Sequence, residues 1–247
     1  VVGTVEEITQ NHITQSLIRE QFEVTYFSHV NFIRAVLPHF REKSNGHIVV
    51  LSCTSGHIGT PGLSIFCASN RALEGYCDSL SYEIAPFNIK LTILQTNKEV
   101  IILTNKIKLA PQLPPYTNGH KTITGLRNIL VNILNRHPQT AAHCSANQSS
   151  SGVISEFPRL SDKAKDKLVM ETVFALIAIG GHENPPVRHI VGHEAVTSVK
   201  ERLKTMSEEL EDYIKVGCAV DMFKDDNSLA TIGRDSAEMN SQPRDFD

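Results

Sequence analysis

The chain has 247 residues, of which 40% are apolar, and carries a net charge of −3 at pH 7. That length and apolar content suffice for a large α/β domain with a sizeable core. Acidic and basic residues are mixed along the sequence without a basic block, so nucleic acids and membrane surfaces are excluded as expected partners.

The cysteines are scattered and form no C-x-x-C pair, and no apolar stretch approaches the roughly 18 residues of a membrane span. We therefore expect a reduced, cytoplasmic protein. The chain begins with Val1 rather than Met, which we interpret as a fragment, a processed chain or a truncated gene model. The cysteines are Cys53, Cys67, Cys77, Cys144 and Cys218.

The first part of the sequence alternates helical and strand patterns. Apolar residues recur at three- and four-residue steps between residues 8 and 40, which predicts a helix. The apolar run at 48–51 predicts a strand buried on both faces, the β-branched stretch at 89–95 predicts a second strand, and residues 63–85 between them have helical periodicity again. This order predicts right-handed parallel crossovers in a doubly wound, Rossmann-like α/β sheet.

The pattern is less regular after residue 95. We expect a proline-rich connection at 108–122, a short helix at 126–134 and a polar loop at 137–160. Ser161 predicts the N-cap of a helix at 163–179, and residues 188–196 predict a third strand.

The last predicted helix, residues 195–216, carries one apolar stripe with alternating three- and four-residue steps. Such a stripe is typical of a coiled-coil seam and also of a helix that covers a sheet, and two heptads do not decide between them. Beyond it, the polar residues 221–247 predict a disordered tail. The stripe consists of Val196, Val199, Leu203, Met206, Leu210 and Tyr213.

The stretch from the first predicted strand to the second resembles the short-chain dehydrogenase/reductase family. It reads GHIVVLSCTSGHIGTPGLSIFCASNRALEGYCDSLSYEIAPFNIKLTIL. In that family a strand ending in Ser-Ser is followed by a Gly-containing loop, by Tyr-x-x-x-Lys on a helix and by another strand. Residues 21–52 and 183–203 are similar to further elements of the classical type. The resemblance implies the C-terminal portion of such a domain over residues 1–220, lacking the N-terminal cofactor-binding strands.

The family's catalytic positions hold other residue types in this chain. Hydride transfer to a carbonyl needs an exchangeable proton beside the reacting oxygen, which a phenol with a lowered pKa supplies in the family. The resemblance places the family's tyrosine, lysine, serine and a supporting asparagine at Phe66, Asn70, Cys53 and Thr25. We therefore predict that no catalytic residue is intact and that the chain is not an active enzyme, either a pseudoenzyme or a truncated member.

Cofactor binding is expected to be lost as well. The family's phosphate-binding turn would precede Val1, and the glycines Gly56, Gly59 and Gly62 have the wrong spacing for a dinucleotide fingerprint. The alternative is an NAD- or NADP-dependent oxidoreductase for a carbonyl or alcohol substrate, with its missing half supplied by a longer chain. A degraded or mispredicted gene product without stable function is a third interpretation.

Other candidate sites have simpler explanations. His189 and His193 would lie about 13 Å apart on an extended strand, too far for one ion, so we expect no metal. Cys53 has no basic neighbour in the sequence that would make it a nucleophile, so we interpret it as a small apolar filler.

The resemblance also implies a mode of self-association. The helices at 14–40 and 63–85 resemble those through which family members form dimers and tetramers, which predicts a homo-oligomer. The first strand is expected to expose an apolar parallel edge.

Overall fold

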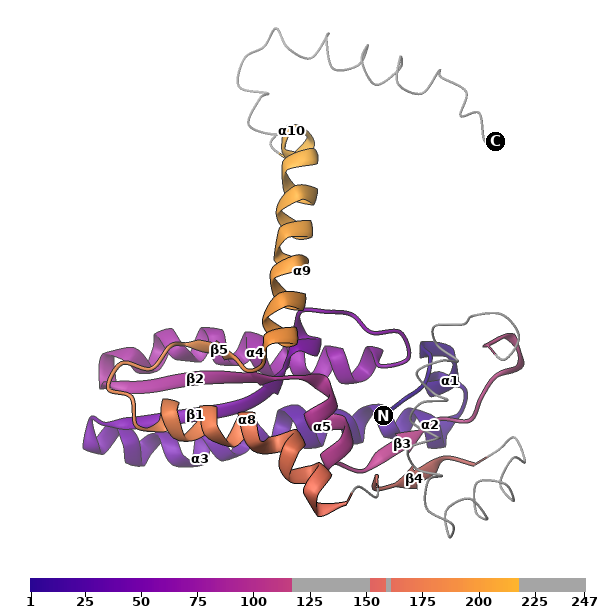
Figure 1. The fold of residues 1–247 in the computed structure, drawn as a ribbon, viewed down its shortest axis with the longest axis horizontal. Coiled ribbons are helices and arrows are strands. Elements are labelled where there is room, and N and C mark those ends of the chain that lie inside the picture. Colours follow the sequence, from indigo (N-terminus) through magenta and orange to yellow (C-terminus); the bar gives the residue numbers. More distant parts are fainter. Residues whose placement is uncertain (117–151, 159–160, 218–247) are drawn as a thin grey trace, which may run out of the picture. The chain divides into compact units, whose positions relative to one another are not determined.

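The computed structural model describes residues 1–116, 152–158 and 161–217, drawn in colour in Figure 1. The helix expected at 126–134, the tail from residue 221 and most of the predicted loop at 137–160 lie outside the described residues. The chain divides into two compact units, residues 1–199 and 200–247. No helix in the described ranges is long and apolar enough to cross a membrane.

A parallel sheet with the strand order β1-β2-β5 forms the centre of the first unit (Figure 1). Strand β1 (Gly46–Cys53) pairs with β2 (Ile89–Thr96) along its whole length, from Gly46 opposite Ile89 to Cys53 opposite Thr96. Strand β5 (Arg188–Ile190) pairs with the second half of β2. The predicted α/β class with a parallel sheet is confirmed.

Helices cover both faces of this sheet. Side chains alternate along a strand, so Ile48 and Val50 pack towards α3 and α4 while Val49 packs near Ala175 and Ile179 of α8 on the other face. The continuous apolar run 48–51 agrees with a strand packed between helices, although Leu51 at its end is 43% exposed.

The N-terminal helical region is divided more finely than the periodicity predicts. It consists of α1 (Val5–Thr9), α2 (His12–Phe22), the π-helical turn η1 (Glu23–Phe27) and α3 (Ser28–Lys43). Asn11 causes the first break, because its side chain accepts a hydrogen bond from the Thr14 N–H and so caps α2.

Helix α4 (Ser64–Ile84) agrees with the helix predicted at 63–85. It follows the short turn η2 (Thr54–Gly56) and leads into the turn η3 (Ala85–Phe87), after which Asn88 takes a positive φ of 54°. Its buried face supplies Leu73, Cys77, Leu80 and Ile84 to the core between α3, α4 and the sheet.

Regular structure continues after β2 and reaches into the first part of the proline-rich connection predicted at 108–122. Residues 98–116 form α5 (Lys98–Thr104), β3 (Ile107–Leu109) and the turn η4 (Pro114–Tyr116), and β3 pairs antiparallel with β4 (Ile154–Glu156). Ile107 and Leu109 are buried, and Val2 bridges to Leu109. Strands of three residues are too short to give a periodic signal.

The third strand predicted at 188–196 is wrong beyond Ile190. The chain turns at Gly192, which has a φ of 92°, and helix α9 (His193–Asp212) begins at the next residue. The predicted last helix is interrupted at Tyr213 and continues as α10 (Ile214–Gly217). Helix α8 (Asp162–Gly180) agrees with the helix predicted at 163–179.

Candidate functional site

A cavity of about 420 Å³ lies beside the first part of α4 and is lined by Thr25, Phe66 and Asn70. The fourth predicted position, Cys53, lies in the same buried apolar cluster as Phe66 and Leu63, which also lines the cavity. The fold therefore gathers all four positions around one site. The remaining walls come from α2, η1, β1, α5 and β3.

Phe66 and Asn70 offer the cavity neither a charge nor an acidic proton. Both side chains are buried, and Asn70 Nδ2 donates a hydrogen bond to the Phe66 backbone carbonyl at 2.8 Å. Asn70 thus uses amide donor capacity within its own helix, and a neutral amide cannot lower the pKa of a neighbouring acid as an ammonium does.

Cys53 is held as a protonated thiol. Burial raises its pKa to about 11, only partly offset by hydrogen bonds between its Sγ and the hydroxyl and N–H of Ser55. The thiolate is the nucleophilic form of cysteine, so Cys53 is unreactive near neutral pH.

Thr25 lies on the π-helical turn η1, where its hydroxyl accepts a hydrogen bond from Gln21 Nε2 at 2.8 Å. His29 lines the same cavity, and burial lowers the pKa of its imidazole, which is therefore neutral at pH 7. At the rim, Lys108 pairs with Glu20. An apolar cavity with a polar rim can enclose a small molecule, and the family's catalytic positions on its wall, Thr25, Phe66 and Asn70, carry no group that titrates near neutral pH.

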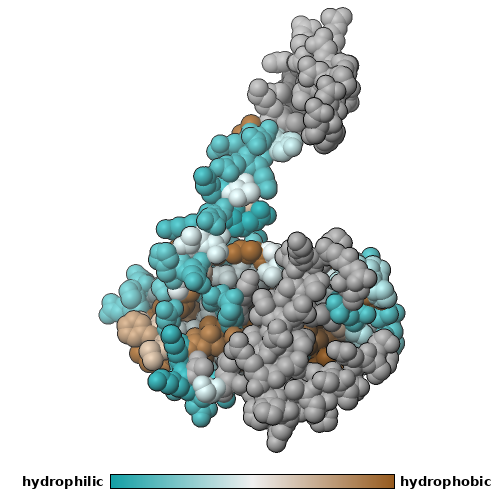
Figure 2. Space-filling view, turned by 45° about the vertical axis from the view of Figure 1, so that its right-hand side comes forward, coloured by the Kyte–Doolittle hydropathy of each residue, from teal (hydrophilic) through white to brown (hydrophobic). Residues whose placement is uncertain are grey.

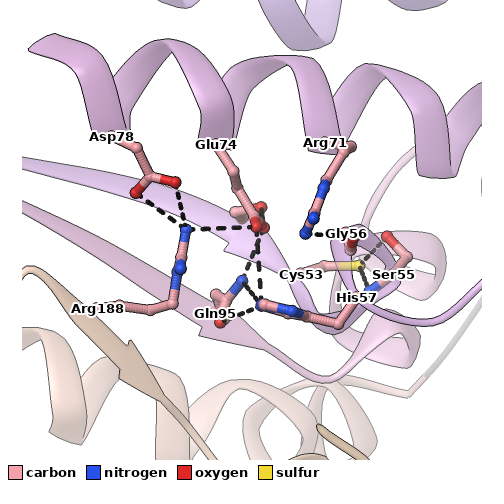
Figure 3. A network of polar contacts seen from close by, with 10 residues as sticks. Cys53, Ser55, Gly56, His57, Arg71, Glu74, Asp78, Gln95 and Arg188 are labelled. Carbon is pink, nitrogen blue, oxygen red and sulfur yellow. Dashed lines mark hydrogen bonds and ion pairs between the residues drawn. The ribbon is translucent and has the colours of Figure 1, made fainter. Parts of the chain in front are cut away.

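A buried polar network lies one helical turn beyond Asn70, and sequence reasoning missed it (Figure 3). The carboxylate of Glu74 is at its centre and is 1% exposed. Its Oε1 accepts hydrogen bonds from Ser52 Oγ at 2.7 Å and from Gln95 Nε2 at 2.8 Å. The Ser52 hydroxyl, adjacent to the family's serine position, is therefore committed to Glu74.

Arg188 and His57 complete the network. Arg188 Nη2 lies 3.8 Å from Glu74 Oε2 and 3.1 Å from both carboxylate oxygens of Asp78. His57 Nε2 lies 3.8 Å from the same Glu74 oxygen and 2.9 Å from Gln95 Nε2. These contacts join α4, both long strands, β5 and the segment after β1 (Figure 3), which points to a structural rather than a catalytic arrangement.

The glycine-containing segment after β1 does not fit the pyrophosphate of a dinucleotide. A Cβ on Gly56 would lie 2.6 Å from Glu74 Oε1, so Gly56 packs directly against a carboxylate. Its carbonyl accepts a hydrogen bond from Arg71 Nη1 at 3.1 Å. A phosphate cradle needs free N–H groups and no neighbouring negative charge.

The histidine-rich segment does not behave as one extended strand. His189 lies in β5, whereas His193 begins α9 after the turn at Gly192, so the strand spacing of about 13 Å does not apply. Across residues 1–116, 152–158 and 161–217, no three His, Cys, Asp or Glu side chains come close enough to hold a metal ion.

The fold and the position of the cavity define a Rossmann-like protein whose candidate site lies between a strand end and the following helix. Residues 2–98 match the family model described as short chain dehydrogenase. Over this range the chain is similar to the short-chain dehydrogenase/reductase family. Residues 183–203, which also resemble the family in sequence, lie outside this match.

Individual proteins show the same likeness. The oxidoreductase BOA17 of Botryotinia fuckeliana is 25% identical over 199 residues, covering 81% of this chain and 62% of that protein. The uncharacterized oxidoreductase YusZ of Bacillus subtilis is 33% identical over 93 residues, covering 38% of this chain and 31% of that protein. The chain thus spans about a third to three fifths of the length of these relatives.

A solved structure shows the same fold. The crystal structure of a short-chain dehydrogenase from Streptomyces avermitilis superimposes with a TM-score of 0.60 at 22% sequence identity. The likeness covers 88% of this chain and 66% of that one.

Proposed function

We propose that this chain is a catalytically silent member of the short-chain dehydrogenase/reductase family, with no bound NAD or NADP. The supporting observation is the composition of the cavity wall. On that wall Phe66 has no proton to transfer and Asn70 has no charge, and in the adjoining apolar cluster the Cys53 thiol is buried with a pKa of about 11. Loss of a general acid alone typically removes a factor of 10² to 10⁴ in rate.

Cofactor titration and turnover assays test this proposal. Purified residues 1–247 are titrated into NADH and NADPH, and the nucleotide fluorescence is followed; oxidation of the nucleotide is then assayed with a panel of ketones and aldehydes. We expect neither saturable quenching nor turnover. Tight saturable quenching of NADPH would contradict the proposal.

A restored variant makes the test stricter. The variant Cys53→Ser/Phe66→Tyr/Asn70→Lys returns the three side chains to the family's types, and we expect it to remain inactive because the glycine segment at Gly56 offers no phosphate site. Circular dichroism of the variant controls for folding. Measurable turnover in a folded variant would show that cofactor binding had survived.

The alternative function is an NAD(P)-dependent oxidoreductase acting on a carbonyl or alcohol. The supporting observation is that the chain covers only 62% of BOA17 and 66% of the Streptomyces chain, so a longer chain could supply the rest. An in-frame upstream sequence encoding a Gly-rich strand and turn, together with NADPH-dependent turnover by the longer chain, supports this alternative. A chain without such a sequence excludes it.

We further propose a cytoplasmic homo-oligomer that associates through the helical regions 14–40 and 63–85. Phe27, Phe32 and Tyr82 are exposed there, and the ring centroids of Tyr26 and Tyr76 lie 6.2 Å apart in an edge-to-face contact that joins the two regions. Light scattering after size-exclusion chromatography measures the mass. Phe27→Asp/Tyr82→Asp is expected to reduce it, and an unchanged mass contradicts this interface.

A further inference from the structure

The second half of α9 carries an apolar stripe that the described chain leaves uncovered. Val199 is buried in the first unit, but from residue 200 onwards every side chain that the structure describes is exposed. The exposed fraction of the stripe residues runs from 39% for Met206 to 71% for Leu210. The uncovered residues are Leu203, Met206, Leu210, Tyr213 and Ile214.

This segment has the properties of one half of a helix pair. Leu203, Met206, Leu210 and Tyr213 follow each other at three-, four- and three-residue steps, the spacing of a coiled-coil seam. The other side of the helix is polar, and the face shown in Figure 2 is mostly hydrophilic. A helix of about 15 residues is marginal alone in water, so a second helix against the stripe would stabilise it.

The charges of the segment are separated along its axis. Residues 200–204 contain three basic side chains and one acidic one, a net +2, whereas residues 208–212 contain four acidic ones, a net −4. Some of this charge is paired within the helix, with Lys204 Nζ 3.6 Å from Glu208 Oε1 and Arg202 Nη1 3.9 Å from Glu209 Oε1. In a parallel pair the acidic halves would lie side by side, whereas in an antiparallel pair the basic half of each helix lies towards the acidic half of the other.

We propose that residues 200–214 form an antiparallel helix pair with the same segment of a second copy of this chain. In an antiparallel seam, residues of one heptad position lie opposite those of the other. Leu203 then lies opposite Tyr213 of the second copy, and Met206 lies opposite Leu210. The same register brings Lys204 level with Asp212 of the second copy. This register pairs only exposed seam residues, so Val199 remains buried in the first unit.

The oligomeric state of the full chain tests the pairing. Light scattering after size-exclusion chromatography, over a range of protein concentrations, compares the wild type with Leu203→Asp/Leu210→Asp. We expect the variant to form a smaller assembly than the wild type, with the dissociation constant for pairing through residues 200–214 raised at least tenfold. Thr205→Asp places an aspartate on the outer side of the helix, half the charge added by the seam variant, and is expected to change nothing.

Three results would overturn the proposal. One is an identical concentration dependence for the wild type and the seam variant; another is equal weakening by Thr205→Asp. A third is a monomeric wild type whose seam variant melts at a lower temperature, because the stripe would then be covered by its own chain. The substituted residues are exposed, so melting curves also show whether the first unit remains folded.

Cysteine cross-linking tests the orientation. In a background with Cys67, Cys144 and Cys218 changed to serine, Leu203→Cys/Tyr213→Cys is expected to form an intermolecular disulfide under mild oxidation. Tyr213→Cys alone is expected to form none, because in an antiparallel pair the two copies of residue 213 lie at opposite ends. Efficient cross-linking of Tyr213→Cys alone would show a parallel pair and contradict the proposed geometry.

Discussion

Burial of the Glu74 carboxylate has to be compensated by its immediate neighbours. An isolated carboxylate in an apolar interior costs several kcal/mol, and removing one member of a buried ion pair typically costs about 3–5 kcal/mol. Oε1 has two hydrogen-bond donors, whereas Oε2 has none and depends on the charge of Arg188, whose Nη2 lies 3.8 Å away. Arg188 is therefore the cation on which this arrangement depends, and it also binds Asp78.

Removal of that cation is expected to destabilise the fold. We predict that Arg188→Met lowers the free energy of unfolding by about 2 kcal/mol, below the usual range for a buried pair because a third of the Arg188 side chain is exposed. Urea denaturation measures the loss, with the exposed Arg34→Met as the matched control. The double variant Arg188→Met/Glu74→Gln is expected to cost less than the sum of the single changes. Additive costs would contradict the proposed coupling.

The buried thiols make stability depend on pH in the alkaline range. Burial raises the pKa of Cys53 to about 11 and that of Cys77 to about 12, whereas a thiol in an unfolded chain titrates near about 8.5. The folded state holds these protons more tightly, so their contribution to stability is complete below pH 8.5 or so and is lost as the pH rises towards 11 and beyond.

Chemical labelling checks the same property at one residue. A thiol with a pKa near 11 is about 0.1% thiolate at pH 8, so we predict that iodoacetamide labels Cys53 roughly a hundred times more slowly than a free thiol. Mass spectrometry of tryptic peptides measures the rate, and half-buried Cys67 is the internal comparison. Labelling in urea should remove the protection. Equal rates at both cysteines in the folded protein would contradict the burial of Cys53.

At the scale of elements, the sequence predicted what a regular pattern encodes. Strands β1 and β2 and helix α4 are recognisable in the sequence because the pattern of apolar residues in each extends over a long stretch. Strand β3 is not predicted because three residues are too few to show a periodic pattern. The strand predicted at 188–196 is too long because apolar residues continue past the turn at Gly192.

Parts of the site were also recognisable. Phe66, Asn70, Cys53 and Thr25 were placed by resemblance, and the structure brings them together. The Glu74 network was missed because its members are far apart in sequence, with 110 residues between Asp78 and Arg188. One signal is present in the sequence: Glu74 is the only charged residue on the buried face of α4.

The segment after β1 depends on the absence of a side chain at Gly56. A Cβ there would lie 2.6 Å from Glu74 Oε1 and 2.8 Å from Cδ, and hydrogen bonds from Ser52 and Gln95 hold that carboxylate in place. We predict that Gly56→Ala costs about 1–3 kcal/mol of stability, as overpacking usually does. Thermal unfolding measures it.

Gly59→Ala is the matched control, because no heavy atom lies within 4 Å of a Cβ at that glycine. It belongs to the same segment and is expected to leave the melting temperature nearly unchanged. Equal destabilisation by the two substitutions would indicate that glycine matters here through chain flexibility and not through contact with Glu74.

At the scale of the whole molecule, strand β1 is the most exposed part of the sheet. Within the ranges that the structure describes, β1 pairs only with β2, so its other edge has free N–H and C=O groups. A groove of about 530 Å³ lies beside it, lined mainly by apolar residues of α3 and β1 such as Phe32, Val36 and Ile48. Eight residues of strand without a charged or proline residue form an edge that favours self-association.

A single charge on this edge is expected to reduce aggregation. Leu51 is 43% exposed on β1, so we predict that Leu51→Lys changes the free energy of unfolding by less than about 1 kcal/mol. We also predict that it raises the highest protein concentration at which no aggregates form. Dynamic light scattering over a concentration series measures this. Phe87→Lys adds the same charge at a residue that is 42% exposed and lies away from the strand edge. If both variants suppress aggregation equally, the loss of an exposed apolar side chain is responsible and the open edge of β1 is not.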